Sequence, residues 1–548
     1  MPASIAFVGA GPTTIYTLCA FIHAAQHPAK ITIFEEQPRA GLGTPYRPGW
    51  NDPAMLSNIA SIEIPPIEET LACWLSRQPR GRLIRLGIDP DAIDEHAFYP
   101  RVALGEFFLD QFNALIERGR ALGFSIDIAS SCRVADIAPE GDGWRVMAEP
   151  RHGAAFEQYF DRIVLATGHQ WPEEPEVRPG YFLSPWPATA LQRIPATSIG
   201  IRGSSLTAID AVVALANAHG TFLETEGQAV EFRLNAGAEA LSLTMMSRKG
   251  LLPEADFYHP VPYEPLAICT PEAMQRLIDK SGDALLEDAY ALFQQELADA
   301  DPAYAAHVEL EKLVLEDFAD RYFADRVAAA PFEWAARNLA EARDNYETRY
   351  TVPWRYAILR MHEVLALIVP HLSSEDLDRF NRYLKPIFVD EYATVPHLSI
   401  ERLLALHRSN LLSVVALGSD HRVNTRGEEP GAIVTVNGAR HHFPVFIDAI
   451  GQRPLGVEAL PFTSLLDEGV VRDSEADDPK GPKGIEIDER FHPVSEHPAA
   501  ERIYCLSIPY ILGRHPFIQG ITSSHEMGEI VGADMADALD AKSQEMAK

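Results

Sequence analysis

The chain of 548 residues is long enough to bury a large core and to form more than one domain. Its 47 basic and 78 acidic residues give a formal charge of −31, which predicts a surface that repels nucleic acid and anionic membranes. The sequence contains no long uncharged apolar run that would span a membrane, and its five cysteines form no CxxC pair or metal-ligand pattern.

A strand, a glycine-rich turn and a helix follow one another at the start of the chain. The apolar run 5–8 predicts a short buried strand, and residues 15–22 predict a helix. Gly9 permits a tight turn, and Gly11 lets the backbone approach a pyrophosphate at the helix N-terminus. Thr14 stands where the usual pattern has a third glycine. A strand this close to the start leaves no room for a signal peptide, so we expect a cytoplasmic protein.

An acidic residue ends the next predicted strand, 30–35. Glu35 lies slightly beyond the usual spacing at which a carboxylate accepts hydrogen bonds from the adenosine ribose. A carboxylate here also argues against a 2′-phosphate. The alternative is a solvated glutamate at a strand end, but the turn and the acid in this order favour a dinucleotide site.

The following segments predict the rest of a first nucleotide-binding domain. A loop with two more glycines covers 41–46, and a helix is predicted over 107–122. The buried strand 161–166 runs into Ala-Thr-Gly, ending at Gly168. Such a tripeptide ends many strands, but its place after a nucleotide motif favours the segment that returns the chain from a flavin domain.

A second nucleotide motif follows a proline-rich link over 171–187. The strand 198–202 leads into Gly203-Ser204-Ser205, where small residues still allow close backbone approach and Ser205 adds a hydroxyl. The next predicted strand, 243–246, is followed by Arg248. A base in place of an acid suits the 2′-phosphate of NADPH. The alternative is a solvated basic turn.

Helical periodicity dominates from about residue 271 to 406, with helices predicted over 283–298 and 354–367. Beyond it we expect strands at 412–417, 432–436, 446–450 and 503–507, a flexible acidic loop at 473–483 and a last helix at 520–539. The expected fold class is α/β, with two Rossmann-like dinucleotide-binding domains and an inserted helical subdomain. The expected domains are a first FAD-binding part (1–190), a first NADPH-binding part (191–265), the helical insert (266–410) and the return of both nucleotide domains (411–548).

Several segments together resemble two-dinucleotide flavoproteins. The chain is more narrowly similar to a group of FAD/NAD(P)-binding proteins, through residues 41–46 with Asn58, Pro100-Arg101 with Gly105, 353–355 and 449–454. Some members resemble flavin-dependent N-monooxygenases, including L-aspartate N-monooxygenases that make nitrosuccinate. The absence of a CxxC dithiol sets the chain apart from flavin disulfide reductases.

The resemblance implies FAD and NADPH as cofactors. It also implies a reaction in which reduced flavin captures O₂ as a C4a-hydroperoxide that hydroxylates the nitrogen of a small amine or amino acid, L-aspartate among the candidates. The residues expected to bind the cofactors are Gly9, Gly11, Thr14, Glu35, Gly43, Asn58, Arg101, Thr167, Gly168, Gly203, Ser205 and Arg248.

An amino-acid substrate would need a clamp for its carboxylate, for which arginine is suited because it binds carboxylates bidentately. The candidates are Arg349, Arg355 and Arg360, with His397 further along the chain, and Arg514, with His515 next to it. No catalytic acid, base or metal ligand is assigned. Two other functions stay open, namely an NAD(P)H-dependent reductase or oxidase and a non-catalytic flavin-binding redox protein. The oligomeric state, a homo-oligomer included, also stays open.

Overall fold

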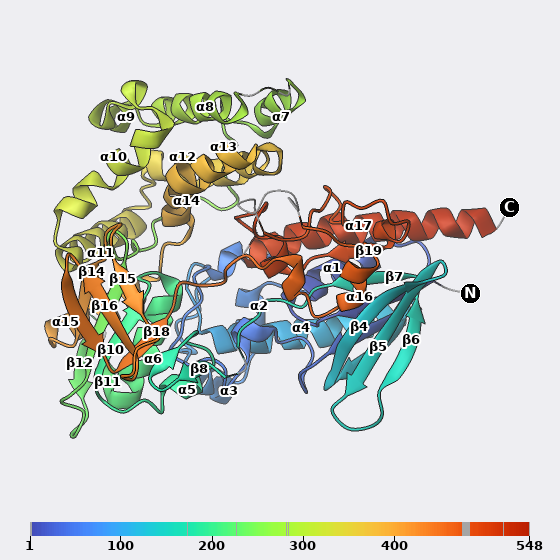
Figure 1. Cartoon of the computed structure of the whole chain (residues 1–548), viewed down its shortest axis with the longest axis horizontal. Coiled ribbons are helices and arrows are strands. Elements are labelled where there is room, and N and C mark those ends of the chain that lie inside the picture. Colours follow the sequence, from blue (N-terminus) through green and yellow to red (C-terminus); the bar gives the residue numbers. More distant parts are fainter. Residues whose placement is uncertain are drawn as a thin grey trace. The chain divides into compact units, whose positions relative to one another are not determined.

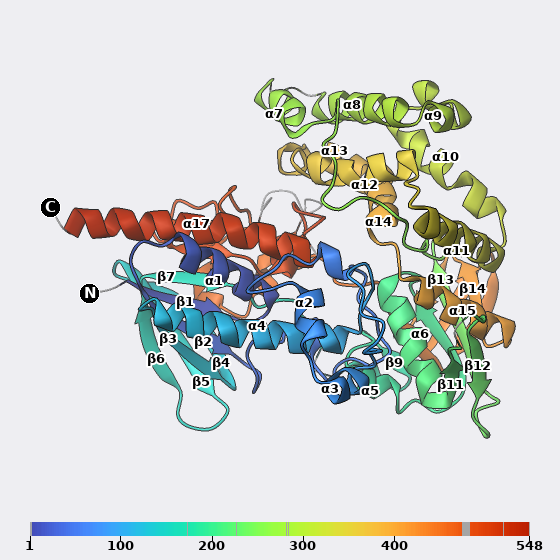
Figure 2. The same cartoon turned by 180° about the vertical axis from the view of Figure 1, so that it is seen from behind.

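A computed structural model describes residues 3–172, 174–225, 227–280, 282, 284–473, 483–518 and 520–546, with side chains to residue 541. The predicted acidic loop lies outside these residues apart from its two ends, Asp473 and Lys483. The chain divides into two compact units (Figures 1 and 2). Unit 1 comprises Met1–Pro48, Ala60–Gln170 and Gln452–Lys548, and unit 2 comprises Gly49–Ile59 and Trp171–Gly451.

A five-stranded parallel sheet forms the centre of unit 1, in the order β19-β7-β1-β2-β3. Its strands are β1 (Ser4–Val8), β2 (Lys30–Glu35), β3 (Ser125–Ser130), β7 (Arg162–Leu165) and β19 (Ile503–Cys505). The first strand pairs with β2 on one side and with β7 on the other. Its apolar residues are buried because elements cover both faces of a parallel sheet.

Three longer helices belong to unit 1: α1 (Pro12–Ala24), α4 (Arg101–Ala121) and α17 (Ile521–Met546). Its remaining elements are the antiparallel strands β4 (Cys132–Glu140), β5 (Gly143–Pro150) and β6 (Phe156–Phe160), and the short helices α2 (Leu71–Ser76), α3 (Arg80–Arg85) and α16 (Thr463–Asp467).

The first and last long helices of the chain, α1 and α17, lie side by side and run in the same direction (Figures 1 and 2). The Thr13 and Ser524 hydroxyls are 3.1 Å apart near the two N-termini. One turn further along, a Cβ placed on Gly528 would lie 2.8 Å from the backbone nitrogen of Thr17. Glycine therefore allows the two backbones to touch at this crossing.

Unit 2 contains a six-stranded sheet in the order β14-β13-β10-β18-β9-β8, parallel except for the edge pair β8–β9. Its strands are β8 (Glu176–Arg178), β9 (Tyr181–Phe182), β10 (Ser198–Arg202), β13 (Ser242–Ser247), β14 (Leu412–Ala416) and β18 (Val445–Asp448). Two antiparallel groups accompany it, β11 (Gly220–Leu223) with β12 (Glu231–Leu234), and β15 (Arg422–Asn424), β16 (Ala432–Val436) and β17 (Ala439–Phe443).

Helices make up most of the chain between β13 and β14, as the sequence predicts. The helices of unit 2 are α5 (Ala188–Leu191), α6 (Leu206–His219), α7 (Pro271–Lys280), α8 (Leu285–Ala300), α9 (Pro302–Val308), α10 (Leu315–Ala328), α11 (Pro331–Thr348), α12 (Pro353–Ala366), α13 (Ser374–Arg379), α14 (Lys385–Tyr392) and α15 (His397–Arg408). Figures 1 and 2 both show α8 beside α12. Among the described residues, no helix is both long enough and apolar enough to cross a membrane.

The two units repeat one topology. In each, a central strand enters a turn and a helix, and its neighbours are the next parallel strand and a returning strand that follows a three-stranded antiparallel group. The predicted fold class, α/β with two Rossmann-like parts and a helical region, is confirmed. The predicted boundaries at 190, 265 and 410 stay a prediction, while in the structure unit 1 breaks off at Gln170 and resumes at Gln452.

Candidate functional site

The first glycine-rich turn is closed by backbone contacts that only glycine permits. Gly9 has a φ of +103°, and a Cβ built on it would lie 2.2 Å from the carbonyl oxygen of Ala166. The Gly9 N–H donates to the Phe34 carbonyl at 2.9 Å. The end of β1 is thus held between β2 and β7. The turn at Gly9 then leads the chain out of the sheet and into α1.

Bare backbone lines the entrance to α1. The Gly41 N–H donates to the Ala10 carbonyl at 2.9 Å, and a Cβ on Gly11 would lie 3.4 Å from the Cα of Gly43. No side chain caps the helix, and its first turn contains no acid. The uncapped start of the helix and the helix dipole therefore suit a pyrophosphate, so the residues present fit the adenine dinucleotide part of FAD.

Thr14 explains how this turn forms without a third glycine. Its side chain is fully buried, and its hydroxyl donates to the Gly9 carbonyl at 2.7 Å. This contact fixes the turn from inside the unit, which favours a supporting position for Thr14 over direct contact with a cofactor.

Glu35 lies at the end of β2 beside the same turn. Its carboxylate accepts hydrogen bonds from the N–H groups of Ala10 at 3.1 Å and Gln37 at 2.8 Å. Burial raises the pKa of Glu35, while these two hydrogen bonds and the Arg47 charge oppose that rise. The carboxylate is therefore fixed where a ribose would meet the strand end.

The carboxyl end of β7 gathers further polar groups of unit 1. The Ser507 hydroxyl lies 2.9 Å from the Thr167 hydroxyl and accepts the Thr167 N–H at 3.1 Å. Gly168 has open space around its Cα. Burial, and then the charge of Arg101, lower the pKa of His169 to about 4, so this imidazole is neutral at physiological pH.

Two of these residues were not predicted from the sequence. His169 directly follows the Ala-Thr-Gly tripeptide, so its place in the sequence could have indicated it. Ser507 lies far away along the chain, and only the pairing of β19 with β7 brings it here.

Asn58, also expected to bind FAD, is exposed and belongs to unit 2. Its segment is held there by Asp52, whose carboxylate accepts from Gln192 at 2.8 Å and from Asn217 at 3.2 Å. A role for Asn58 in cofactor binding stays a prediction.

The turn after β10 repeats the geometry of the first turn. Gly203 has a φ of +129°, and a Cβ on it would lie 2.5 Å from the carbonyl oxygen of Ala449. Its N–H donates to the Met246 carbonyl at 2.7 Å. Ser205 is exposed at the N-cap of α6, and its hydroxyl does not cap that helix. The backbone at this helix start is as open to an anion as that of α1.

The strand register shows which residue of unit 2 corresponds to Glu35. In unit 1, Gly9 bonds to Phe34 and Glu35 follows; in unit 2, Gly203 bonds to Met246 and Ser247 follows. A neutral serine therefore takes the place of the acid, and the exposed Arg248 comes next. Lys249 instead pairs with Asp320 at 3.0 Å and lies over the Phe323 ring.

The four arginine candidates for a carboxylate clamp do not all lie in one unit: three belong to unit 2 and Arg514 belongs to unit 1. Arg349 is exposed and ends α11 in a left-handed conformation. Arg360 donates to the carbonyls of Glu264 and Pro265, both at 3.0 Å. Arg514 belongs to unit 1, where burial and then Arg514 lower the pKa of His515 to about 4.

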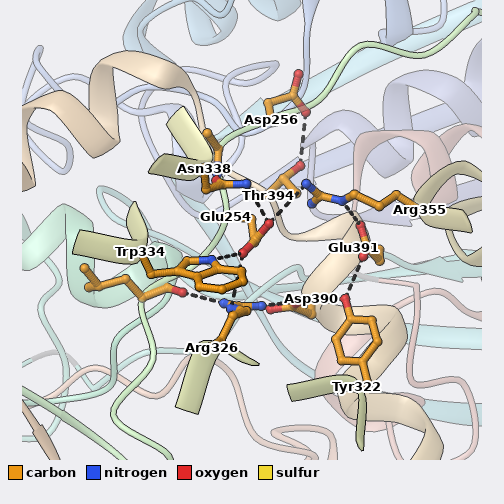
Figure 3. Close-up of polar contacts among 12 residues, drawn as sticks. Glu254, Asp256, Tyr322, Arg326, Trp334, Asn338, Arg355, Asp390, Glu391 and Thr394 are labelled. Atoms are coloured by element: carbon orange, nitrogen blue, oxygen red, sulfur yellow. Dashed lines mark hydrogen bonds and ion pairs between the residues drawn. The ribbon is translucent and has the colours of Figure 1, made fainter. Parts of the chain in front are cut away.

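Arg355 differs from the other three because it is only 5% exposed and already pairs with two carboxylates. It contacts Glu254 at 3.1 Å and Glu391 at 2.9 Å (Figure 3). These partners favour a structural role over the binding of a substrate. His397 is also engaged, since its Nε2 donates to the Asp256 carbonyl at 2.8 Å.

Two matches place the chain among known proteins. Residues 6–170 match the FAD-NAD(P)-binding family, and residues 270–392 match the YdhS-like middle domain. Together with the first turn, the former match shows that residues 6–170 form an FAD-NAD(P)-binding domain.

The chain is 40% identical to the Escherichia coli (strain K12) protein YdhS over 525 residues, covering 96% of both proteins, and it belongs to the YdhS family. That relative is named as uncharacterized protein YdhS, so the match shows the family and not a reaction.

Solved structures share the fold at low sequence identity. The ornithine N-hydroxylase KtzI of Kutzneria sp. 744 is similar with a TM-score of 0.52 and 13% identity, covering 99% of this chain and all of that one. The ornithine hydroxylase PvdA of Pseudomonas aeruginosa gives a TM-score of 0.50 at 12% identity, covering 98% and 99% of the two chains. These likenesses confirm the predicted similarity in fold to flavin N-monooxygenases. The aspartate-specific resemblance is not among them.

Proposed function

We propose that this protein is an FAD- and NADPH-dependent monooxygenase that hydroxylates the nitrogen of a small amine or amino acid. The observation that carries the proposal is the pair of geometrically matched turns, which differ in the last residue of the second strand. One has Glu35, as a ribose site requires, and the other has Ser247 followed by Arg248, as a 2′-phosphate requires.

Unit 1 would hold FAD through its bare backbone and its fixed acid. The N–H groups at the start of α1 would bind the pyrophosphate, and Glu35 would accept the ribose hydroxyls. When bound, FAD supplies the redox chemistry, accepting hydride from NADPH and reacting with O₂. The neutral His169 follows the carboxyl end of β7, where ligands of open parallel sheets bind, and Arg101 at the start of α4 is close enough to lower its pKa.

Unit 2 would hold NADPH in the corresponding way. The N-terminus of α6 would bind the pyrophosphate, with the Ser205 hydroxyl beside it. Arg248 would pair with the 2′-phosphate, and Ser247 would leave room for that phosphate where a carboxylate would repel it.

An amine substrate must lose its ammonium proton before its nitrogen can attack an electrophilic oxygen, so activity should rise with pH until another step limits the rate. For an amino acid, Arg349, an exposed residue of unit 2, and Arg514 of unit 1 stay candidates for holding the carboxylate. The fold likeness to ornithine hydroxylases supports amino acids as a substrate class, and we include aspartate among those to be tested.

The test measures NADPH consumption, H₂O₂ release and hydroxylamine formation with a panel of amines and amino acids. We expect one substrate class to stimulate NADPH oxidation and to gain oxygen on nitrogen by mass spectrometry. NADPH consumption matched by H₂O₂ with every amine would contradict oxygen transfer and support an oxidase. Electron transfer to an added acceptor without any N-oxygenated product would support a reductase. Flavin that NADPH does not bleach would support a non-catalytic redox protein.

A further inference from the structure

A buried cluster of five charged side chains lies among the helices of unit 2 (Figure 3). It contains three carboxylates and two guanidinium groups: Glu254, Asp390 and Glu391 with Arg326 and Arg355. Glu391 is 1% exposed and Arg326 is 6% exposed. If all five groups were ionised, the cluster would carry one uncompensated negative charge in a medium of low dielectric constant, which is costly.

Glu254 is fully compensated within this cluster. Its two oxygens contact Arg326 at 3.2 Å and Arg355 at 3.1 Å, and they accept hydrogen bonds from Trp334 at 2.6 Å and Asn338 at 2.7 Å. Burial opposes ionisation of Glu254, but the two arginines outweigh it and hold its pKa below the usual range. The excess negative charge therefore belongs to the other two acids.

Tyr322 lies between those two acids. Its hydroxyl oxygen is 2.8 Å from Asp390 Oδ2 and 2.6 Å from Glu391 Oε1. A phenol has one hydrogen and can form only one strong bond as a donor. Two ionised carboxylates at these distances would leave one anionic oxygen facing the lone pairs of the phenol.

A single proton on Glu391 gives every one of these short contacts a donor. Glu391 Oε1–H donates to the Tyr322 oxygen, and Tyr322 donates to Asp390 Oδ2, which also accepts from Arg326 at 2.5 Å. The second oxygen of Glu391 accepts from Arg355 Nε at 2.9 Å. The cluster then contains two anions and two cations and is neutral.

The surrounding groups agree with this assignment. Burial raises the pKa of Glu391 to about 7, with Arg355 opposing the rise and Asp390 adding to it. Burial also raises the pKa of Asp390, but the charge of Arg326, which contacts Asp390 at 2.5 Å, opposes that rise, so the proton belongs on Glu391. Burial also raises the pKa of Tyr322 and of the neighbouring Tyr304 on α9, so both phenols stay protonated. The charge of Arg337, on α11, also lowers the pKa of Glu254.

We propose that this cluster binds one proton on Glu391, in the chain Glu391–Tyr322–Asp390, and that the proton is released to solvent when the surrounding helices open. The proposal does not depend on the reaction that the protein catalyses. Both arginines contact Glu254, and Arg326 also donates to the Leu252 carbonyl, so the proton stabilises the contact between the segment after β13 and helices α10, α12 and α14.

The sign of the linkage follows from the raised pKa. Between the pKa of an unfolded glutamate and about 7, the closed state holds a proton that the open state lacks, so raising the pH favours opening. Below that range both states are protonated, and above about pH 7 both are ionised, so the dependence on pH levels off on either side.

The variant that tests this is Glu391→Gln, because an amide keeps the shape of the protonated acid and donates to Tyr322. Amide hydrogen exchange in α10 and α14 is compared between wild type and variant at each pH, so that the intrinsic exchange rates cancel. The opening constant of wild type relative to the variant should rise about tenfold per pH unit up to about pH 7 and then level. Glu341→Gln, on the exposed side of α11, is the matched control and should leave the wild-type profile unchanged.

Infrared spectroscopy provides a second test that does not require the glutamine variant to be stable. At about pH 6, exposed carboxylates are ionised, and wild type should show the carbonyl band of a protonated carboxyl group that disappears at about pH 9. Tyr322→Phe should shift this band, since it removes the acceptor of the proton. A wild type without the band, a band retained in Glu391→Gln, or a flat ratio of opening constants would overturn the proposal.

Discussion

At the scale of single residues, each nucleotide turn can form only because its first residue is glycine, which has no Cβ. Gly9 and Gly203 both face the carbonyl oxygen of an alanine that directly follows the returning strand, Ala166 in unit 1 and Ala449 in unit 2. Both glycines also have a positive φ. A side chain at either position must therefore shift backbone, which cannot yield as a flexible side chain does.

Gly9→Ala should cost about 1–3 kcal/mol of stability and give protein with little bound flavin, because the added methyl group displaces β7 from β1. Flavin absorbance per protein and urea denaturation measure the two effects.

Gly81→Ala is the matched control for this prediction, because Gly81 lies on α3 with only the end of the Arg85 side chain near its Cα. Gly203→Ala should produce the equivalent defect in unit 2, weakening the binding of NADP⁺ while flavin is retained. Full flavin content in Gly9→Ala would contradict the structural account of the turn.

Arg248→Ala should raise the NADPH Michaelis constant about tenfold to a hundredfold and leave that for NADH nearly unchanged, since one charge-assisted contact to the 2′-phosphate is lost. Steady-state kinetics with both cofactors measure the ratio. Lys249→Ala is the control, because Lys249 already pairs with Asp320 and should affect the ratio little.

The reciprocal change tests the strand register directly. Ser247→Glu restores an acid at the position that Glu35 occupies in unit 1, and combined with Arg248→Ala it should reverse the preference in favour of NADH. Equal use of NADPH and NADH by wild type would refute the assignment.

At the scale of elements, the sequence predicts well what depends on local spacing. The strand 198–202 and the strand 432–436 coincide with β10 and β16, and the two nucleotide turns are found where they were predicted. Helix α4 begins at Arg101, earlier than the predicted residue 107, because Pro100 at its N-cap starts the helix.

Contacts between distant segments could not be predicted in this way. Arg355 has the residue type of a carboxylate clamp, but its carboxylates come from the segment after β13 and from α14. The assignment of Ser247 to the position of the acid also required the strand register. Sequence reasoning placed the base near the ribose but could not tell which residue replaces the acid.

The crossing of α1 and α17 gives a prediction at this scale. Gly528→Ala should reduce the stability of unit 1 by about 1–3 kcal/mol, because the new methyl group would meet the backbone of α1 at Thr17 and Tyr16. Flavin should also be held less tightly, because Thr13 beside the nucleotide turn contacts Ser524 of α17. Urea denaturation and flavin release on dilution measure these effects.

Glu529→Ala is the control, since Glu529 is the exposed neighbour of Gly528 on the same helix. If Gly528→Ala were as stable as this control, the two helices could not be in backbone contact.

At the scale of the whole molecule, unit 1 is built from three stretches of chain and unit 2 from two. A chain that stops after Gly451 retains every strand of the unit 2 sheet but lacks β19 and α17 of unit 1. We expect this truncated protein to contain no flavin and still to bind NADP⁺, as measured by absorbance and titration calorimetry. Adding residues 452–548 as a separate chain should restore flavin binding, and flavin in the truncated protein alone would contradict the division into units.

The pairing of α1 with α17 has a consequence for how the protein is made. The ribosome synthesises α1 before unit 2 and α17 after it, so the nascent α1 must wait for its partner while the whole of unit 2 emerges. The side of α1 that α17 covers stays exposed throughout elongation, a state in which chains recruit chaperones or aggregate. Unit 1 therefore cannot finish folding before residues 521–546 have been synthesised, and its cofactor must be bound after the whole of unit 2 has emerged.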